Sequence, residues 1–375
     1  MLVDPRQTIA GRRVFVTGAN GFIGRRLVHT LNQAGAKVTI LSRSGRGTTA
    51  RHGSSVRTIV GELNDAGLLA TAFRNQEIVF HLAYDGRATA AANLAAFDSV
   101  LRGSIEAGVG RIVHTSSIVV YDDWPNGDID ESGSMSRPGG SGYRQAKIEM
   151  ERRLMAGRIP AAILQPTIVY GPGSALWTEQ FLEWLSAGDI VLPTPEGHCS
   201  GVFVDDLVQA LLRAAALQDL GRERLIVSGP EPFPWSHLLE GYARIVGSRS
   251  GTVQQVPVEE LQSRLGPAPD DDHQDEGPSR AAVIHTVGRR VFGRERFERT
   301  LRLIKARLAG GGRMYPDRHL LELFSATGHC HIGHARERLG FDPEFDLAKG
   351  LAATASELRG RYASSNSPRR LTSAT

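Results

Sequence analysis

Short apolar runs alternate with longer amphipathic segments through the first half of the chain. Apolar runs of this length predict buried strands, and they cover residues 14–17, 38–41, 56–60, 78–82, 111–115 and 162–164. Between them, apolar positions recur with helical spacing over residues 23–34, 65–73, 94–107 and 143–156. This alternation predicts an α/β fold, a doubly wound parallel sheet with helices on both faces.

The pattern loosens after residue 171 into loops rich in proline and glycine. Helices are expected over 178–187 and 205–217, and a strand over 224–228. We therefore expect a sheet domain over 10–170, a smaller substrate-binding portion over 171–362 interleaved with the last sheet elements, and a disordered polar tail over 363–375. Residues 269–278 form an acidic linker, and 289–307 a basic helical stretch that is a solvated face or, alternatively, an anion site.

Composition fits a globular protein of 375 residues with 41% hydrophobic content and a formal net charge of +4. The basic residues are scattered, so we expect no nucleic-acid partner. Two cysteines, Cys199 and Cys330, are too few for a disulfide framework, and the start of the chain lacks the apolar stretch of a signal peptide. No apolar segment approaches bilayer length. A cytoplasmic protein without a membrane partner is therefore expected.

The first apolar run leads directly into a glycine-rich turn that contains Gly18, Gly21 and Gly24, and a helix is expected to begin near Phe22. Gly18 permits a tight turn, Gly21 lets bare backbone approach a pyrophosphate, and Gly24 lets the helix pack against the strand. The strand, turn and helix context predicts binding of a dinucleotide.

Tyr143 and Lys147 lie four residues apart, so both side chains are expected on the same side of one helix. A neighbouring cation favours the phenolate, which would let Tyr143 exchange a proton with a substrate near neutral pH. Ser117 follows the strand 111–115 at the edge where ligands bind in open α/β sheets, and its hydroxyl is suited to hold a substrate oxygen. Ser116 is interpreted as a spacer.

With these motifs in order, the chain resembles the extended short-chain dehydrogenases/reductases, the group also described as NAD-dependent epimerases/dehydratases, which have a Rossmann-type fold. Residues 17–24 match the group's cofactor motif, 81–83 its fourth-strand motif, Asn93 the asparagine of the next helix, and Ser117, Tyr143 and Lys147 its catalytic trio. Later matches are 166–173, 204–207 and 335–343. Positions that the resemblance assigns to the cofactor are Gly18, Asn20, Gly21, Phe22, Ile23, Gly24, Ser42, Arg43, Glu62, Leu63, Leu82, Ala83, Tyr143, Lys147, Pro166 and Ile168.

The resemblance implies an NAD(P)-dependent enzyme that transfers hydride at a secondary alcohol or ketone. Tyr143 would be the acid or base, Lys147 would hold the nicotinamide ribose and lower the pKa of Tyr143, and Ser117 would orient the substrate oxygen. Ser42 stands where NAD-preferring enzymes carry an acid and Arg43 follows it, with Arg46 nearby, so NADP is expected in preference to NAD.

The substrate expected first is a sugar or nucleotide sugar, either epimerised or oxidised. The alternative is NADPH-dependent reduction of a ketone or aldehyde in a non-sugar molecule, and a non-catalytic nucleotide-binding regulator is a third possibility. Ile168 and Cys199 stand where nucleotide-sugar epimerases of the group carry phosphate-contacting Asn and Arg. No metal site is expected, because His329, Cys330, His331 and His334 lack zinc-ligand spacing. A homodimer is expected by analogy with the family.

Overall fold

The computed structural model describes residues 4–45, 48–248, 250–266 and 312–363 of the chain. These residues form two compact units, each made of separate stretches of sequence. The first unit holds residues up to 171, 200–232 and 328–346, and the second unit holds the stretches between and after these. The acidic linker 269–278, the basic stretch 289–307 and Arg46 lie outside the described residues, as does the tail after residue 363.

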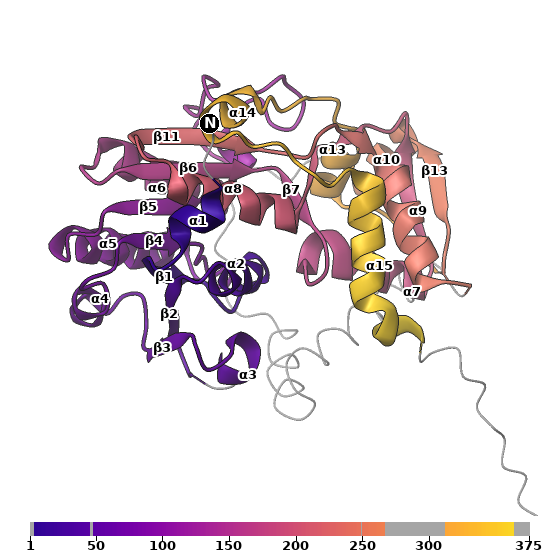
Figure 1. Ribbon diagram of the computed structural model, residues 1–375. Helices are drawn as coiled ribbons and strands as arrows, with labels where there is room; N and C mark the ends of the chain where they lie inside the picture. Colours follow the sequence, from indigo (N-terminus) through magenta and orange to yellow (C-terminus); the bar gives the residue numbers. More distant parts are fainter. Residues whose placement is uncertain (1–3, 46–47, 249, 267–311, 364–375) are drawn as a thin grey trace, which may run out of the picture. The chain divides into compact units, whose positions relative to one another are not determined.

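A seven-stranded sheet forms the centre of the first unit, in the order β11-β6-β5-β4-β1-β2-β3 (Figure 1). Every pair of neighbouring strands is parallel, which confirms the predicted Rossmann-type fold. The strands are β1 (Arg13–Thr17), β2 (Lys37–Ser42), β3 (Arg57–Val60), β4 (Ile78–His81), β5 (Arg111–Thr115), β6 (Ala161–Pro166) and β11 (Arg222–Val227).

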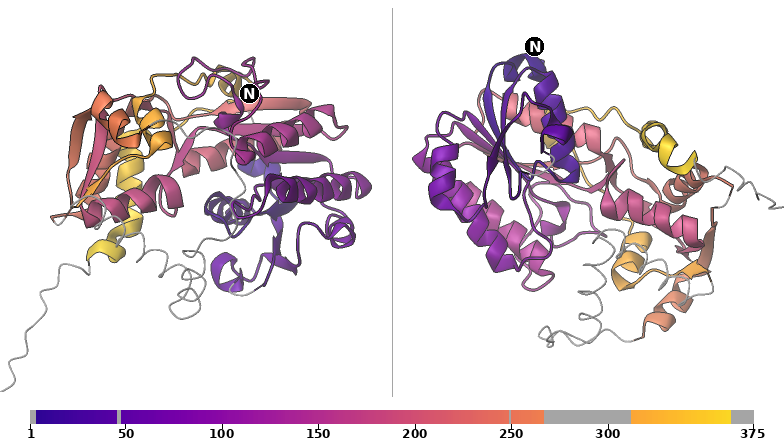
Figure 2. Two further views of the ribbon diagram at one scale, coloured as in Figure 1. Left: turned by 180° about the vertical axis from the view of Figure 1, so that it is seen from behind. Right: turned by 90° about the horizontal axis from the view of Figure 1, so that it is seen from below.

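Helices cover both faces of this sheet (Figure 2). Alternate residues along each strand point to opposite faces, so Phe15 and Val79 belong to one apolar core while Val16 and Phe80 belong to the other. The first core is closed by α4 (Ala66–Ala72), α5 (Ala90–Glu106) and α6 (Gly142–Ala156). The second is closed by α2 (Phe22–Gln33) and α8 (Val204–Ala216), with α1 (Pro5–Ile9) and α14 (Gly333–Leu339) beside α8.

Smaller elements complete the first unit. They are α3 (Thr48–His52), the 3₁₀ helix η1 (Ile118–Val120), and the parallel pair β7 (Ile168–Tyr170) and β10 (Gly201–Phe203). Residues Ile129 and Cys330 form an isolated bridge, which joins the loop after η1 to the last segment of this unit.

The second unit has a three-stranded parallel sheet with the order β13-β8-β14. Its elements are a π-helical turn η2 (Ala175–Glu179), α7 (Gln180–Ala187), β8 (Asp189–Thr194), β9 (His198–Cys199), β12 (Phe233–Pro234), α9 (Trp235–Val246), β13 (Val253–Pro257), α10 (Val258–Leu265), β14 (Arg313–Met314), α13 (Arg318–Ser325) and α15 (Leu347–Ala363). Phe181, Trp235 and Phe324 are fully buried and contact one another through their rings.

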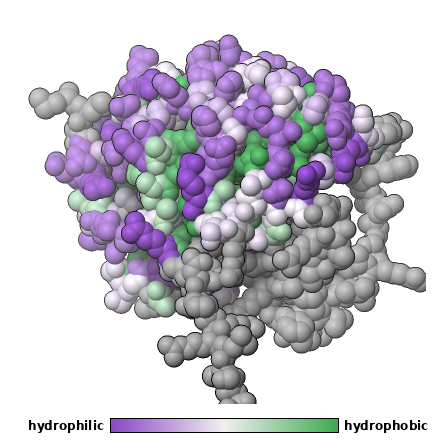
Figure 3. Space-filling view, turned by 90° about the vertical axis from the view of Figure 1, so that its right-hand side faces the viewer, coloured by the Kyte–Doolittle hydropathy of each residue, from purple (hydrophilic) through white to green (hydrophobic). Residues whose placement is uncertain are grey.

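Hydrophilic groups dominate the surface seen in Figure 3, and hydrophobic groups lie between them in interrupted patches. None of the helices within the described residues combines the length and the apolar content needed to cross a bilayer.

Candidate active site

The glycine turn joins β1 to α2 and leaves no room for side chains at two positions. Gly18 has a φ of +71°, and a Cβ atom there would lie 2.8 Å from the backbone nitrogen of Ala83. A Cβ atom on Gly24 would lie 2.2 Å from the carbonyl oxygen of Gly18. Gly21 is the N-cap of α2, and no side chain caps this helix end. Free N–H groups at a helix N-terminus attract phosphate, so the turn has the form that a dinucleotide pyrophosphate requires.

The end of β2 lies beside this turn and carries the residues expected to contact the adenosine ribose. Asn20 donates from Nδ2 to Ser42 Oγ at 3.2 Å, and His52 Nε2 lies 3.3 Å from Asn20 Oδ1. Arg43 is largely exposed and pairs with Asp85, with 3.2 Å between Nη1 and Oδ2. The structure thus brings Asn20, Ser42 and Arg43 together, and it adds His52 and Asp85, which the sequence analysis missed.

Cations gather around His52 as well. Burial, followed by the charges of Arg51 and Arg25, lowers the pKa of His52 below its ordinary value. Neither of these arginines pairs with a carboxylate among the described residues. The region beside Ser42 is therefore positively charged.

The loop after β4 carries the next expected cofactor residues. Ala83 donates its backbone N–H to Thr17 Oγ1 at 3.4 Å, and Leu82 packs against the core beneath the turn. Asn93 fixes this loop because its side chain accepts from the backbone of Asp85 at 2.9 Å and donates back to the Asp85 carbonyl at 3.0 Å.

Four expected cofactor residues lie elsewhere along the carboxyl edge of the sheet. Glu62 is exposed just after β3, and Leu63 packs partly against the core. Pro166 ends β6 and is buried, and Ile168 begins β7 and is 5% exposed. Ile168 donates its backbone N–H to the Ser200 carbonyl at 3.1 Å.

The proposed catalytic trio meets at the ends of β5 and α6. Ser117 caps η1 by accepting from the backbone of Val119, and it acts on Tyr143 by lowering the pKa of that phenol. Ser141 caps α6 by accepting from the backbone of Arg144, which places Tyr143 in the first helical turn. Lys147 is one turn further on, 3% exposed, and donates from Nζ to the Thr115 carbonyl at 2.7 Å.

Burial shifts the pKa values of both titratable members of the trio. Burial raises the pKa of Tyr143 above its ordinary value, although Ser117 acts in the opposite direction. The groups that shift this pKa in the chain alone do not include Lys147, so the lowering expected from Lys147 stays a prediction. The Lys147 ammonium lies over the rings of Tyr84 and Tyr143, 5.4 Å and 5.7 Å from their centroids, and donates to backbone. Burial lowers the pKa of Lys147 to about 8, while the carboxylate of Glu151 acts to raise it.

Glu151 is fully buried one helical turn beyond Lys147 and is the centre of a polar network. It accepts from Ser116 Oγ, from Gln165 Nε2 at 3.0 Å and from Arg224 Nε at 2.7 Å. Ser116 is thus more than the spacer it was expected to be. A carboxylate four residues after Lys147 was the available signal for this network, because that spacing places both groups on one face of the helix.

Two buried histidines lie under the same edge of the sheet. The Nδ1 atoms of His81 and His114 are 3.1 Å apart, and burial followed by the charge of Lys147 lowers the pKa of both rings far below neutrality. The Nε2 atom of His114 has no hydrogen-bond partner within the described part of the chain. Both rings are therefore neutral.

The histidine-rich segment near residue 330 has a structural role in the first unit. The backbone of Ile129 accepts from His331 and donates to His329, each at 2.8 Å. Burial raises the pKa of the Cys330 thiol to about 12, so this sulfur is a poor metal ligand at neutral pH. Among the residues that the structure describes, no cluster of three or more His, Cys, Asp or Glu is arranged to hold a metal ion.

Comparisons with known proteins show the family of the chain. Residues 14–227, more than half of the chain, match the model of the NAD dependent epimerase/dehydratase family. A ketoreductase of a farnesyl-dihydroquinoline oxide from Stigmatella aurantiaca is 27% identical over 181 residues, which are 46% of this chain and 54% of that protein. A ceramide reductase from Caulobacter vibrioides is 26% identical over 66% of this chain and 74% of its own length. The chain thus spans little more than half the length of the first of these curated relatives.

Solved structures have the same fold. An epimerase from Methanothermobacter thermautotrophicus superimposes with a TM-score of 0.68 at 17% identity over 96% of both chains. A UDP-glucose 4-epimerase from Thermotoga maritima gives a TM-score of 0.65 at 18% identity over 93% of this chain and 99% of its own. With the family match, the glycine turn and the Ser117, Tyr143 and Lys147 geometry, the chain belongs to the NAD-dependent epimerase/dehydratase family of NAD(P)-dependent enzymes.

Proposed function

We propose that the protein is an NADPH-dependent reductase of a ketone or aldehyde in a small non-sugar molecule, with Tyr143 as the proton donor. The observation that carries this proposal is the buried ammonium of Lys147, which lies 5.7 Å from the centroid of the Tyr143 ring at the strand end that carries Ser117. Tyr143 itself is 37% exposed, so its ring remains accessible to a ligand.

The bound cofactor would supply hydride from C4 of its nicotinamide ring to the carbonyl carbon. Tyr143 donates the phenolic proton to the carbonyl oxygen, which becomes the hydroxyl of the alcohol product. Its raised pKa keeps Tyr143 protonated at neutral pH and thus ready to act as an acid. Ser117 holds the same oxygen by a hydrogen bond, and the ammonium of Lys147 stabilises the tyrosinate that is left.

The non-sugar substrate was the alternative in the sequence analysis, and two observations now favour it. Ile168 is 5% exposed and Cys199 is fully buried, so neither side chain is available to contact a nucleotide phosphate. The curated relatives named above act, by their names, on a farnesylated ring ketone and on a ceramide. The fold neighbours that bind UDP-sugars share less than a quarter of their residues with this chain.

We further propose NADP as the cofactor. Ser42 has no negative charge to repel a 2′-phosphate, and Arg43, Arg25 and Arg51 supply cations around it. Asp85 pairs with Arg43 and partly offsets this charge. Asp85 is shared, because it also pairs with Arg87. A phosphate can therefore displace Asp85 from Arg43.

A panel of ketones and aldehydes with long apolar, aromatic and sugar substituents tests the reaction. The proposal expects stoichiometric loss of NADPH absorbance with an apolar carbonyl compound. A UDP-sugar that is epimerised with no net change in absorbance would contradict it. Tight NADPH binding without turnover of any compound would favour a regulator instead.

A further inference from the structure

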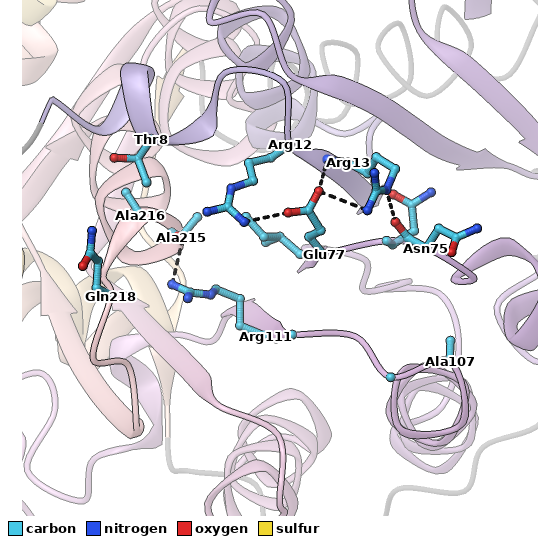
Figure 4. Close-up of a pocket in the computed structure, with 14 residues that line it drawn as sticks. Thr8, Arg12, Arg13, Asn75, Glu77, Ala107, Arg111, Ala215, Ala216 and Gln218 are labelled. Carbon is cyan, nitrogen blue, oxygen red and sulfur yellow. Dashed lines mark hydrogen bonds and ion pairs between the residues drawn. The ribbon is translucent and has the colours of Figure 1, made fainter.

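A hollow of about 590 Å³ opens at the amino edge of the large sheet, opposite the edge where Ser117 and Lys147 lie (Figure 4). Three neighbouring strands begin here, since Arg13 opens β1, Ile78 opens β4 and Arg111 opens β5. The remaining lining comes from α1 and from the ends of α5 and α8. The hydride-transfer reaction uses none of these residues.

Positive charge is in excess around the hollow. Arg12, Arg13 and Arg111 line it together with a single carboxylate, Glu77. That carboxylate is shared, because it lies 2.7 Å from Arg12 Nη1 and 3.5 Å from Arg13 Nη2. The carboxyl ends of α5 and α8 add roughly half a negative charge each, which does not cancel the remaining two guanidinium charges.

Arg111 faces Arg12 without a carboxylate of its own. It donates to the carbonyl oxygens of Ala215, at 2.9 Å, and Leu217. Within the described residues, no acidic side chain pairs with it. Burial and the positive charge of Arg12 both lower the pKa of Arg111, so the two guanidinium groups repel each other across the hollow. An anion between them would relieve that repulsion.

Neutral polar groups complete the lining, with Thr8, Asn75 and Gln218 at its sides (Figure 4). Gln76 also lines the hollow and is 9% exposed. Its Oε1 atom is buried and has no hydrogen-bond partner in the described part of the molecule. Solvent does not reach this atom, so the neutral polar groups that can meet a ligand hydroxyl are those of Thr8, Asn75 and Gln218.

We infer that this hollow is a second binding site, for a small hydroxylated molecule that carries a phosphate group. The phosphate lies between Arg12 and Arg111, whose planar guanidinium groups suit its oxygens. The hydroxylated part fills the remaining space and hydrogen-bonds to Thr8, Asn75 and Gln218. The volume lies within the range of about 300–1,000 Å³ that is usual for small-molecule sites.

Titration calorimetry of the full chain with glycerol 3-phosphate, inorganic phosphate and glycerol tests this site. The titrations are done with saturating NADPH, so that the glycine turn is occupied, and also without it. Glycerol 3-phosphate is expected to bind, inorganic phosphate more weakly, and glycerol not at all. Arg12→Gln and Arg111→Gln should each weaken binding about tenfold, as expected for loss of a charge-assisted hydrogen bond.

Two further variants separate the site from a general effect of charge or folding. Glu77→Gln frees Arg12 and should tighten binding, a gain that misfolding cannot produce. Arg57→Gln removes an exposed arginine from the same edge of the sheet outside the hollow, and it should bind as the wild type does. Arg111 also holds the end of α8, so Arg111→Gln could unfold the protein. In that case the affinities of Arg12→Gln and Glu77→Gln for glycerol 3-phosphate test the site.

The inference is overturned if glycerol 3-phosphate does not bind, or if Arg12→Gln and Glu77→Gln leave its affinity unchanged. Equal losses in Arg12→Gln and Arg57→Gln would overturn it too, because binding would then follow net charge. Equal affinity for inorganic phosphate and glycerol 3-phosphate would overturn the claim that the hydroxylated part of the ligand is recognised. NADPH binding is measured separately, so failure of the proposed function is distinguishable from failure of this site.

Discussion

The ammonium group of Lys147 donates to the backbone carbonyl of Thr115 at 2.7 Å, in an environment that leaves only 3% of the residue exposed. This contact ties α6 to the end of β5. It positions the cation under Tyr143 at the cost of removing a charged group from water. The cost is visible in the pKa of Lys147, which burial lowers to about 8.

Lys147 should therefore make stability depend on pH above neutrality. The unfolded chain keeps this proton up to the ordinary pKa of 10.5, whereas the folded chain loses it near 8. Between these values the unfolded state binds more protons, so the wild type gains stability as pH rises, by at most about 1.4 kcal/mol per pH unit. Urea unfolding at pH 7.5, 8.5 and 9.5 should show this gain relative to Lys147→Met. Lys37→Met, which removes an exposed lysine, should show no such difference from the wild type.

Tyr143→Phe should lower kcat by about 10²- to 10⁴-fold, the usual contribution of general acid catalysis, and leave the affinity for NADPH nearly unchanged. Tyr84→Phe is the matched control, because the two rings pack edge to face with their centroids 4.8 Å apart. The measurement is the steady-state rate of NADPH oxidation with a ketone or aldehyde that the wild type reduces. Equal losses in the two variants would show that ring packing matters and the Tyr143 hydroxyl does not.

Arg43→Ala should weaken NADPH binding about tenfold and leave NADH binding unchanged, because only NADPH carries the 2′-phosphate. Fluorescence titration of each nucleotide gives the two dissociation constants. Arg87→Ala is the control, since Arg87 pairs with the same carboxylate, Asp85. A parallel loss for both nucleotides would contradict the role given to Arg43.

His52 should take up a proton when NADPH binds. Its pKa lies below the ordinary value of 6.5 in the chain alone, so the ring is mostly neutral at pH 7. A phosphate dianion next to it would raise that pKa and favour the charged ring. Calorimetry in buffers with different ionisation enthalpies should detect proton uptake with NADPH, none with NADH, and none with NADPH in His52→Gln. His29→Gln, on the exposed side of α2, should retain the wild-type uptake.

Much of the fold was predictable because the sheet is buried on both faces. The predicted helix 143–156 is Gly142–Ala156 in the structure, and the strand 111–115 is β5 without change. The predicted strand 162–164 was too short by three residues, since β6 is Ala161–Pro166. Gln165 breaks the apolar pattern there, yet it is buried through hydrogen bonds to Glu151 and Tyr121.

The site was predictable only where chemistry follows local spacing. Tyr143 and Lys147 lie on one helix, so their separation alone brings them together. The contact of His52 with Asn20 joins segments 32 residues apart. The hollow around Arg111 is assembled from six elements, β1, β4, β5, α1, α5 and α8. Such contacts depend on how the elements pack against one another. The spacing of apolar residues along the sequence does not predict that packing. The helix 178–187 also begins earlier, with the π-helical turn Ala175–Glu179.

The buried contact between His81 and His114 has a consequence for hydrogen position. Two neutral imidazoles joined through their Nδ1 atoms must differ in tautomer, because one nitrogen donates and the other accepts. If His114 donates, its Nε2 is a bare acceptor; if His114 accepts, that Nε2 carries the hydrogen. Exchange between the two arrangements reverses the polarity of the pair without changing its net charge. A titration near neutral pH would not detect it, whereas the nitrogen chemical shifts of the two rings would.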